Sequence, residues 1–174
     1  MQNLSKFPYY AAMPSYAHTI LNSLGWPHTT PEDRPNCAKF TLALPDGEIP
    51  ATAEGLADSR IVILYLPFAL VVPDSKRPEI ARLLVKINND TAMGWWCLDV
   101  SSGSIWYRMT IIGETKDDLK LFRSSVEDGC RIFMEWQKCI AVTITEEMGA
   151  DKSFYIKHVL EGSDIAGIIG KYRP

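Results

Sequence analysis

The stretch from residue 88 to residue 108, NNDTAMGWWCLDVSSGSIWYR, constrains the fold more than any other part of the sequence. Two short strand-like runs flank a Ser-Ser-Gly turn, which is the pattern of a β-hairpin. If Asp99 pairs with Ser104 across the turn, Trp96 lies opposite Tyr107. The same register sets Leu98 opposite Ile105, so this stretch predicts an antiparallel hairpin with one face in the core.

Three further strands are predicted before the hairpin. Residues 40–44 alternate apolar and small side chains, and a Pro-Asp-Gly turn leads into residues 48–53. Asp58 and Ser59 then turn the chain into residues 61–66. This last segment is apolar on both sides and rich in β-branched residues, so we expect it to be covered on both faces.

Two helices are predicted from apolar residues that recur every three or four positions. The first spans residues 15–24, with Ser15 as N-cap, and ends at Gly25 and Pro27. The second begins near Pro78, which is tolerated in a first turn, and ends near Asn88. Its apolar stripe consists of Ile80, Leu83, Leu84 and Ile87.

A long third helix is predicted after Thr115, which is a suitable cap with an acidic residue three positions later. Its apolar stripe consists of Leu119, Phe122, Val126, Cys130, Phe133 and Ile140. Its far end is open, because residues 140–145 are better strand formers than helix formers.

The predicted order is therefore α-β-β-β-α-β-β-α. Antiparallel hairpins with helices packed on them define the α+β class, here with one mostly antiparallel five-stranded sheet and three helices. The length of 174 residues suits one domain, which we assign to residues 1–148, followed by a C-terminal extension over residues 149–174.

Composition narrows the classes of function. The chain is 47% hydrophobic and 22% charged, as in ordinary globular proteins, and its net charge of −3 argues against a grip on nucleic acid. The longest apolar run, residues 61–72, contains Pro67 and is too short to span a bilayer, and the N-terminus does not resemble a signal peptide. We therefore expect a cytoplasmic protein without a membrane partner.

Neither a metal site nor a cofactor site is predicted. The cysteines Cys37, Cys97, Cys130 and Cys139 form no CxxC pair, so we expect small buried apolar side chains without disulfides. His18, His28 and His158 are far apart in the sequence and lack zinc-ligand spacing, so we expect surface or half-buried histidines. The chain shows no nucleophile motif, and we expect it not to be an enzyme.

The residues around the hairpin resemble a known family. The helix that ends at Asn88 is followed by Gly94, Trp96, Leu98, Asp99, Gly103, Tyr107 and Arg108 in the order and spacing of the YbjN-like family of putative bacterial sensory transduction regulators. The resemblance covers about residues 39–142. It implies the type III secretion chaperone-like fold, frequent homodimers and, in the chaperone relatives, binding of extended protein segments, without catalysis.

The hairpin register also predicts a partner-binding face. Opposite the core side it carries Trp95, Cys97, Trp106 and Arg108, with Trp95 diagonal to Trp106 and able to stack beneath the Arg108 guanidinium. Two large aromatic side chains are rarely left bare on a monomer. The cover is either the chain's own segments 7–10 or 154–156, or a partner protein, or a second subunit.

Two classes of function follow. The first is a non-catalytic protein-binding or regulatory module that uses exposed apolar surface of the sheet and helices. We also expect it to form a homodimer, because residues 61–66 are apolar on both sides and the helices are too few to cover both faces. The alternative is a small-ligand-binding protein or an enzyme whose site is assembled from scattered residues such as Asp99, Tyr107 and Arg108.

Overall fold

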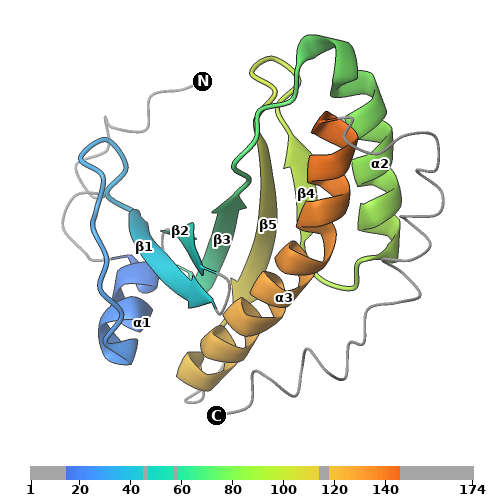
Figure 1. Ribbon diagram of the computed structural model, residues 1–174. Coiled ribbons are helices and arrows are strands. Elements are labelled where there is room, and N and C mark those ends of the chain that lie inside the picture. Colours follow the sequence, from blue (N-terminus) through green and yellow to red (C-terminus); the bar gives the residue numbers. More distant parts are fainter. Residues whose placement is uncertain (1–14, 45–46, 57–58, 114–117, 146–174) are drawn as a thin grey trace.

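The computed structural model describes residues 15–44, 47–56, 59–113 and 118–145. Its elements follow the predicted order (Figure 1). They are α1 (Tyr16–Leu24), β1 (Cys37–Leu44), β2 (Gly47–Gly55), β3 (Ile61–Pro67), the 3-10 turn η3 (Asp74–Lys76), α2 (Arg77–Asp90), β4 (Trp95–Leu98), β5 (Ile105–Ile112) and α3 (Asp118–Thr145). The α+β class and the predicted order of elements are confirmed, apart from η3.

All five strands form one antiparallel sheet in the order β1-β2-β3-β5-β4. One face of this sheet carries the apolar core. Its buried side chains are Ala38, Phe40, Leu42, Ala51, Ala53, Val62, Leu64, Leu66, Trp96, Ile105, Tyr107, Met109 and Ile111. Side chains alternate between the two faces of a strand, so this single set fixes the register of every strand.

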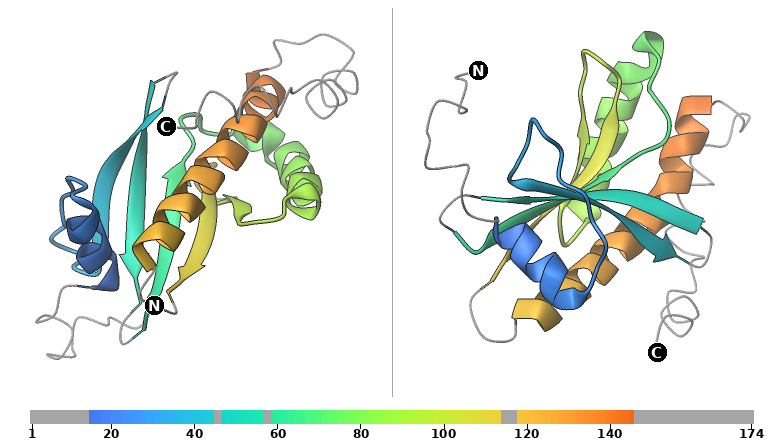
Figure 2. Two further views of the ribbon diagram at one scale, coloured as in Figure 1. Left: turned by 90° about the horizontal axis from the view of Figure 1, so that it is seen from below. Right: turned by 90° about the vertical axis from the view of Figure 1, so that its left-hand side faces the viewer.

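The three helices pack on that same face. Their buried side chains belong to one cluster with those of the sheet, including Leu21 of α1, Ile80 of α2 and Phe133 of α3. In Figure 1, α3 crosses the front of the sheet with α2 beside it. The right-hand view of Figure 2 shows α1 near the start of α3, below the strands.

The opposite face of the sheet has no helix packed on it among the described residues, and we call it the helix-free face. Its side chains are Cys37, Lys39, Thr41, Ala43, Glu48, Pro50, Thr52, Glu54, Ile61, Ile63, Tyr65, Pro67, Trp95, Cys97, Trp106, Arg108, Thr110 and Ile112. No described helix therefore covers this side of residues 61–66, which we expected to be covered on both faces. Ile63 is nevertheless buried, whereas Trp95 and Ile112 are 52% and 53% exposed.

Helix α3 continues to Thr145, which decides the question left open by its β-branched end. Ile140, Thr143 and Ile144 are buried there, so tertiary packing outweighs the strand propensity of the segment. Gly129 lets the helix approach β5, because an added Cβ would lie 3.2 Å from the sulfur of Met109. Leu119, assigned to the buried stripe, is instead 38% exposed. The predicted cap at Thr115 lies outside the described residues.

Helix α1 begins and ends as predicted, with Gly25 in the left-handed conformation at its C-terminus. The Ser15 side chain does not cap the helix, however. Its hydroxyl group donates to the Asn36 carbonyl at 3.1 Å and lies 2.7 Å from Nδ1 of His18. Ser15 therefore ties α1 to the segment before β1.

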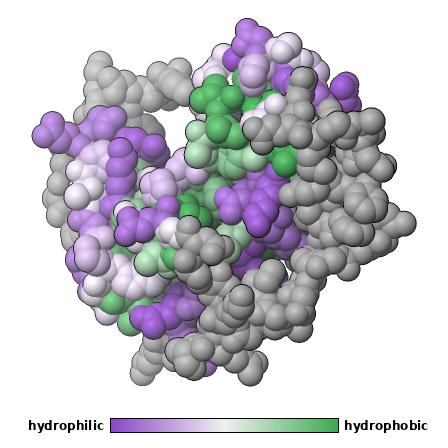
Figure 3. Space-filling view, in the orientation of Figure 1, coloured by the Kyte–Doolittle hydropathy of each residue, from purple (hydrophilic) through white to green (hydrophobic). Residues whose placement is uncertain are grey.

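The helix-bearing side is shown as a space-filling view in Figure 3, where a green apolar area lies over the link between β3 and α2. Val71 in that link is 63% exposed. Within the described ranges, no helix combines the length and hydropathy needed to cross a membrane.

Candidate functional site

The β4–β5 hairpin has the register expected from the sequence. Trp95 pairs with Arg108, and Cys97 pairs with Trp106. The backbone N–H of Asp99 donates to the carbonyl of Ser104 at 2.9 Å, which closes the turn. Trp95, Cys97, Trp106 and Arg108 consequently lie together on the helix-free face.

The edge of β4 is held by a side chain of α2. The backbone N–H of Trp96 donates to Oδ1 of Asn88 at 2.7 Å, and Nδ2 of Asn88 donates to the Trp96 carbonyl at 3.0 Å. The amide thus takes the place of a neighbouring strand and blocks an edge that could otherwise pair with another chain. This contact fixes which residues of β4 face the core and which face outward.

Two glycines allow the hairpin to close tightly. Gly94 has φ of +69°, and an added Cβ would lie 2.3 Å from the Tyr107 hydroxyl oxygen. Gly103 has φ of +76°, and an added Cβ would lie 2.3 Å from the carbonyl oxygen of Val72. Both positions require glycine for its conformational freedom and for space.

Asp99 is a turn residue. Its carboxylate accepts hydrogen bonds from the Ser101 hydroxyl at 2.6 Å, the Ser101 N–H at 2.8 Å and the Ser102 hydroxyl at 2.8 Å. These bonds, led by that of the Ser101 side chain, lower the pKa of Asp99 to about 2. The carboxylate is therefore ionised and fully engaged in shaping the turn.

Arg108 belongs to a row of paired residues that crosses the sheet, one strand in from the β4 edge. It lies between Trp95 on β4 and Tyr65 on β3, and Tyr65 is paired with Thr52 on β2. The Tyr65 hydroxyl donates to Oε2 of Glu54 at 2.9 Å. Burial, followed by this hydrogen bond and the charge of Glu54, raises the pKa of Tyr65 to about 12.

The carboxylate of Glu54 is already surrounded by donors. Besides Tyr65, it accepts hydrogen bonds from Nη2 of Arg34 at 3.3 Å and from Nδ2 of Asn36 at 3.2 Å. Glu54 forms its ion pair with Arg34, and no ion pair between Glu54 and Arg108 occurs among the described residues.

The guanidinium of Arg108 has neither a hydrogen bond nor an ion pair within the described residues, and its Nε is buried without a partner. Its positive charge acts on both neighbours, since it opposes the burial that raises the pKa values of Tyr65 and Cys97. The expected stacking of Arg108 on Trp95 is not formed among the described residues, nor is a ring contact between Trp95 and Trp106. Trp95 instead presents about half of its surface to solvent.

The scattered site of the alternative reading does not assemble. Tyr107 is fully buried on the core face, where its hydroxyl donates to the Met93 carbonyl at 2.6 Å. Arg108 lies on the other face and Asp99 at the turn. Asp99, Tyr107 and Arg108 therefore do not converge on one pocket.

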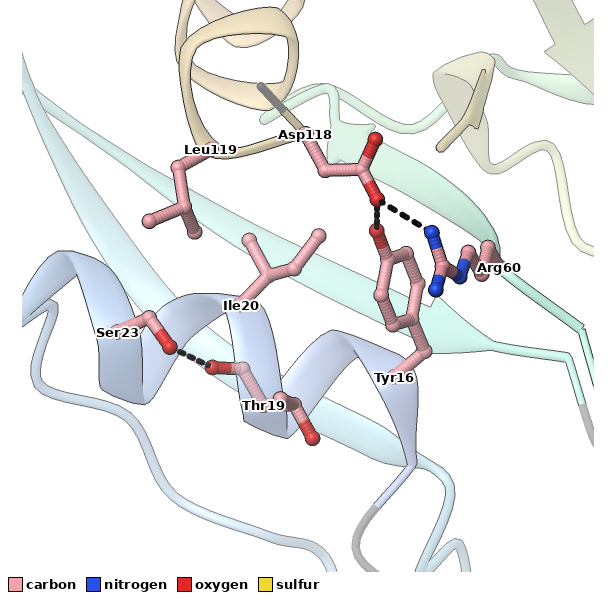
Figure 4. Close-up of a pocket in the computed structure, with 7 residues that line it drawn as sticks. All are labelled: Tyr16, Thr19, Ile20, Ser23, Arg60, Asp118 and Leu119. Carbon is pink, nitrogen blue, oxygen red and sulfur yellow. Dashed lines mark hydrogen bonds and ion pairs between the residues drawn. The ribbon is translucent and has the colours of Figure 1, made fainter. Parts of the chain in front are cut away.

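A shallow groove of about 550 Å³ lies between α1 and the start of α3 (Figure 4). The Tyr16 hydroxyl donates to Oδ2 of Asp118 at 2.5 Å, and Nη1 of Arg60 lies 3.5 Å from the same oxygen. Burial and the Asp118 contact raise the pKa of Tyr16 to about 12. These groups engage one another and join the two helices, so we interpret the groove as a structural junction.

The second groove, of about 710 Å³, opens beside β1 and β2. Three prolines and three threonines line it, together with His28, Lys39, Phe40 and Ala51. None of the lining residues is acidic, so the groove offers no pair of carboxylates for acid–base catalysis.

The histidines differ from the expectation. His18 is buried, and its ring lies 5.4 Å from that of His28, so these two residues are neighbours in space. Both ring nitrogens of His18 have partners, namely the hydroxyl groups of Ser15 and Thr30. His158 lies outside the described residues. No cluster of three or more metal-ligating side chains occurs in the described part of the chain.

The four cysteines are free. Cys37, Cys130 and Cys139 are buried as expected, and burial raises the pKa of each thiol. Cys97 is only half-buried and lies on the helix-free face. The segments 7–10 and 154–156, considered above as cover for this face, lie outside the described residues.

Comparison with known proteins does not place the chain in a family. No protein-family model matches it and no curated protein matches it, so the resemblance to the YbjN-like family is not confirmed. One similar solved structure is titled "Crystal Structure of the ExsC-ExsE Complex". It is 16% identical, covers 71% of this chain and 89% of that chain, and has a TM-score of 0.48. A similarity at this level gives no information on what the present chain binds.

Proposed function

We propose that the protein is a non-catalytic binding module that docks another protein on the helix-free face of its sheet. One observation carries the proposal: all three helices pack on one face, and the other face carries Trp95, Trp106, Tyr65 and the unpaired Arg108. Tryptophan, tyrosine and arginine are the residue types that dominate the energetics of protein interfaces.

The composition of the helix-free face supports this proposal. An antiparallel sheet can leave one face in water, but the side chains on such a face are normally polar. Here the aromatic Trp95 and the β-branched Ile112 are about half exposed. Covering them would release water from apolar surface, at about 25 cal/mol for each Å² that is buried.

The edges of the sheet favour docking on the face. Asn88 already occupies the hydrogen-bonding groups of Trp96 on the β4 edge. On the β1 edge, Thr29 and Lys39 exchange two backbone hydrogen bonds of 2.8 Å. Strand addition is blocked at these two points, whereas the side chains of the helix-free face are not used by any described helix.

A regulatory role in the bacterial cytoplasm, as the family resemblance implies, is part of this proposal. A second copy of the chain is the other candidate occupant of the face, as the sequence-based expectation of a homodimer requires. Light scattering at tens of micromolar distinguishes the two occupants, because a monomer mass excludes the second copy.

Site-specific photo-cross-linking tests the proposal. Benzoylphenylalanine is placed at Thr110, which is exposed on the helix-free face, and at Lys120, which is exposed on α3, as the matched control. In extract from the source cells, we expect a discrete cross-linked protein from position 110 that is lost with Trp106→Ala. Equal products from both positions, or a product that persists in Trp106→Ala, would exclude this face as the docking site.

A further inference from the structure

Among the described residues, Arg108 carries the unsatisfied polar group on the helix-free side of the hairpin. Asp99 is held by Ser101 and Ser102, and the Tyr107 hydroxyl donates to Met93. Only two buried side-chain nitrogens or oxygens of the described residues lack a hydrogen-bond partner, Nε1 of Trp96 and Nε of Arg108. Trp96 faces the core, so Arg108 is the unsatisfied group on the helix-free face.

A charge that is partly removed from water without a counterion is costly. The acidic residue within this network, Glu54, already accepts bonds from Tyr65, Arg34 and Asn36. The Tyr65 hydroxyl donates its proton to Glu54, and no hydrogen bond joins Tyr65 to Arg108 among the described residues. The missing counterion must come from outside the described residues.

We propose, on the basis of the function proposed above, that the docked partner is a protein segment that places an Asp or Glu carboxylate on Arg108. A planar guanidinium such as that of Arg108 binds a planar carboxylate through two parallel N–H···O bonds. Apolar residues on either side of that acid pack against Trp95 and Trp106, which flank Arg108 in the hairpin register.

The hairpin carries a single cation on this face, Arg108, and this favours a carboxylate over a phosphate. Sites for phosphorylated segments use clusters of arginines. Here the other arginine of the network, Arg34, is paired with Glu54 at 3.3 Å, and one unpaired guanidinium remains beside aromatic rings. A singly charged acid within an apolar segment fits this arrangement.

In a second copy of the chain, the described residues around Arg108 offer no unengaged carboxylate. In a twofold interface the same patch meets itself, so Arg108 would face the residues of its own patch. The carboxylate of that patch is Glu54, which has its three donors in each copy. Since the described residues of a second copy offer Arg108 no such carboxylate, the occupant that we propose is a different polypeptide.

The test uses a displayed library of random dodecapeptides, selected on the purified full-length protein. Binding of each peptide is then measured to wild type, Trp106→Ala, Arg108→Gln and Arg108→Lys. The matched control is Arg123→Gln, which removes an exposed arginine on α3. For each acidic peptide, a variant with the corresponding amide is included, and far-ultraviolet circular dichroism confirms that each protein variant is folded.

We expect peptides that contain an acidic residue between apolar residues and that need Trp106. Arg108→Gln should weaken them about tenfold or more, Arg123→Gln should leave them unchanged, and the amide peptide should no longer distinguish Arg108→Gln from wild type. Peptides that need Trp106 but contain no acidic residue, or whose binding is unchanged by Arg108→Gln, would overturn the carboxylate inference but would still support docking on the helix-free face. Peptides that ignore Trp106→Ala, or an absence of binders, would overturn both. A dimer that Trp106→Ala dissociates, without peptide binding, would replace the partner by a second copy.

Discussion

The two hydrogen bonds between Asn88 and the backbone of Trp96 predict how much the edge of β4 contributes to stability. Each hydrogen bond contributes about 0.5–1.5 kcal/mol net, and its loss here leaves a backbone group of a buried residue unpaired. Asn88→Ala should therefore lower the free energy of unfolding by about 2 kcal/mol. For a domain of this size, that corresponds to a decrease of roughly 4–8 °C in Tm.

Urea unfolding monitored by circular dichroism measures the effect, and Asn89→Ala is the matched control. Asn89 is the next residue of α2 and is exposed, so its replacement reproduces the gain in helix propensity without breaking the contact to β4. Asn88→Ala should also promote self-association through the opened edge. If the two variants unfold within about 0.5 kcal/mol of each other, the amide does not hold the strand.

Burial, and then the charge of His28, lower the pKa of His18 below its ordinary value of 6.5, so the unfolded chain binds a proton at higher pH than the folded chain. The stability that this pKa difference contributes is complete above about pH 6.5 and decreases as the pH falls below that value. Between pH 7 and pH 5, Tm should therefore fall less steeply in His18→Gln than in wild type. Equal slopes of Tm against pH in the two proteins would contradict this. Trp136→Ala should lower the free energy of unfolding by about 3–5 kcal/mol because Trp136 is buried in the core. Trp106→Ala should instead weaken association by about 2 kcal/mol or more with little loss of fold, and the reverse order of effects would make Trp106 a core residue. Replacement of all four cysteines by Ala or Ser should reduce the free energy of unfolding in urea by a few kcal/mol, about 1–2 kcal/mol for each buried side chain, and leave partner binding intact. Stoichiometric zinc in the purified protein would contradict this purely structural role of the cysteines.

The hairpin was predictable because two signals agree in its sequence. Its turn residues fix where the chain reverses, and alternation then fixes which side chains share a face, so Trp95 and Arg108 could be placed opposite each other before any coordinates. Helix α1 and the apolar stripe of α2 were predictable for the same kind of reason, since both depend on local spacing.

The remaining features depend on contacts between distant segments. Asn88 shows no sign in the sequence that its amide will pair with Trp96, and the approach of His18 to His28 depends on the course of the loop before β1. Residues 61–66 are apolar on both sides, so their pattern cannot reveal that the described helices cover only one face. The lack of a partner for Arg108 could be recognised only after Glu54 was found to be occupied.

The central claim, that the helix-free face docks another protein, is tested most directly by ¹⁹F NMR of the protein labelled with 5-fluorotryptophan. The chain has five tryptophans, and single Trp→Phe variants assign their signals. On addition of the protein captured by cross-linking, the account predicts that the signals of Trp95 and Trp106 shift while that of the buried Trp136 stays in place. Unchanged signals from Trp95 and Trp106 in a saturated complex would contradict it.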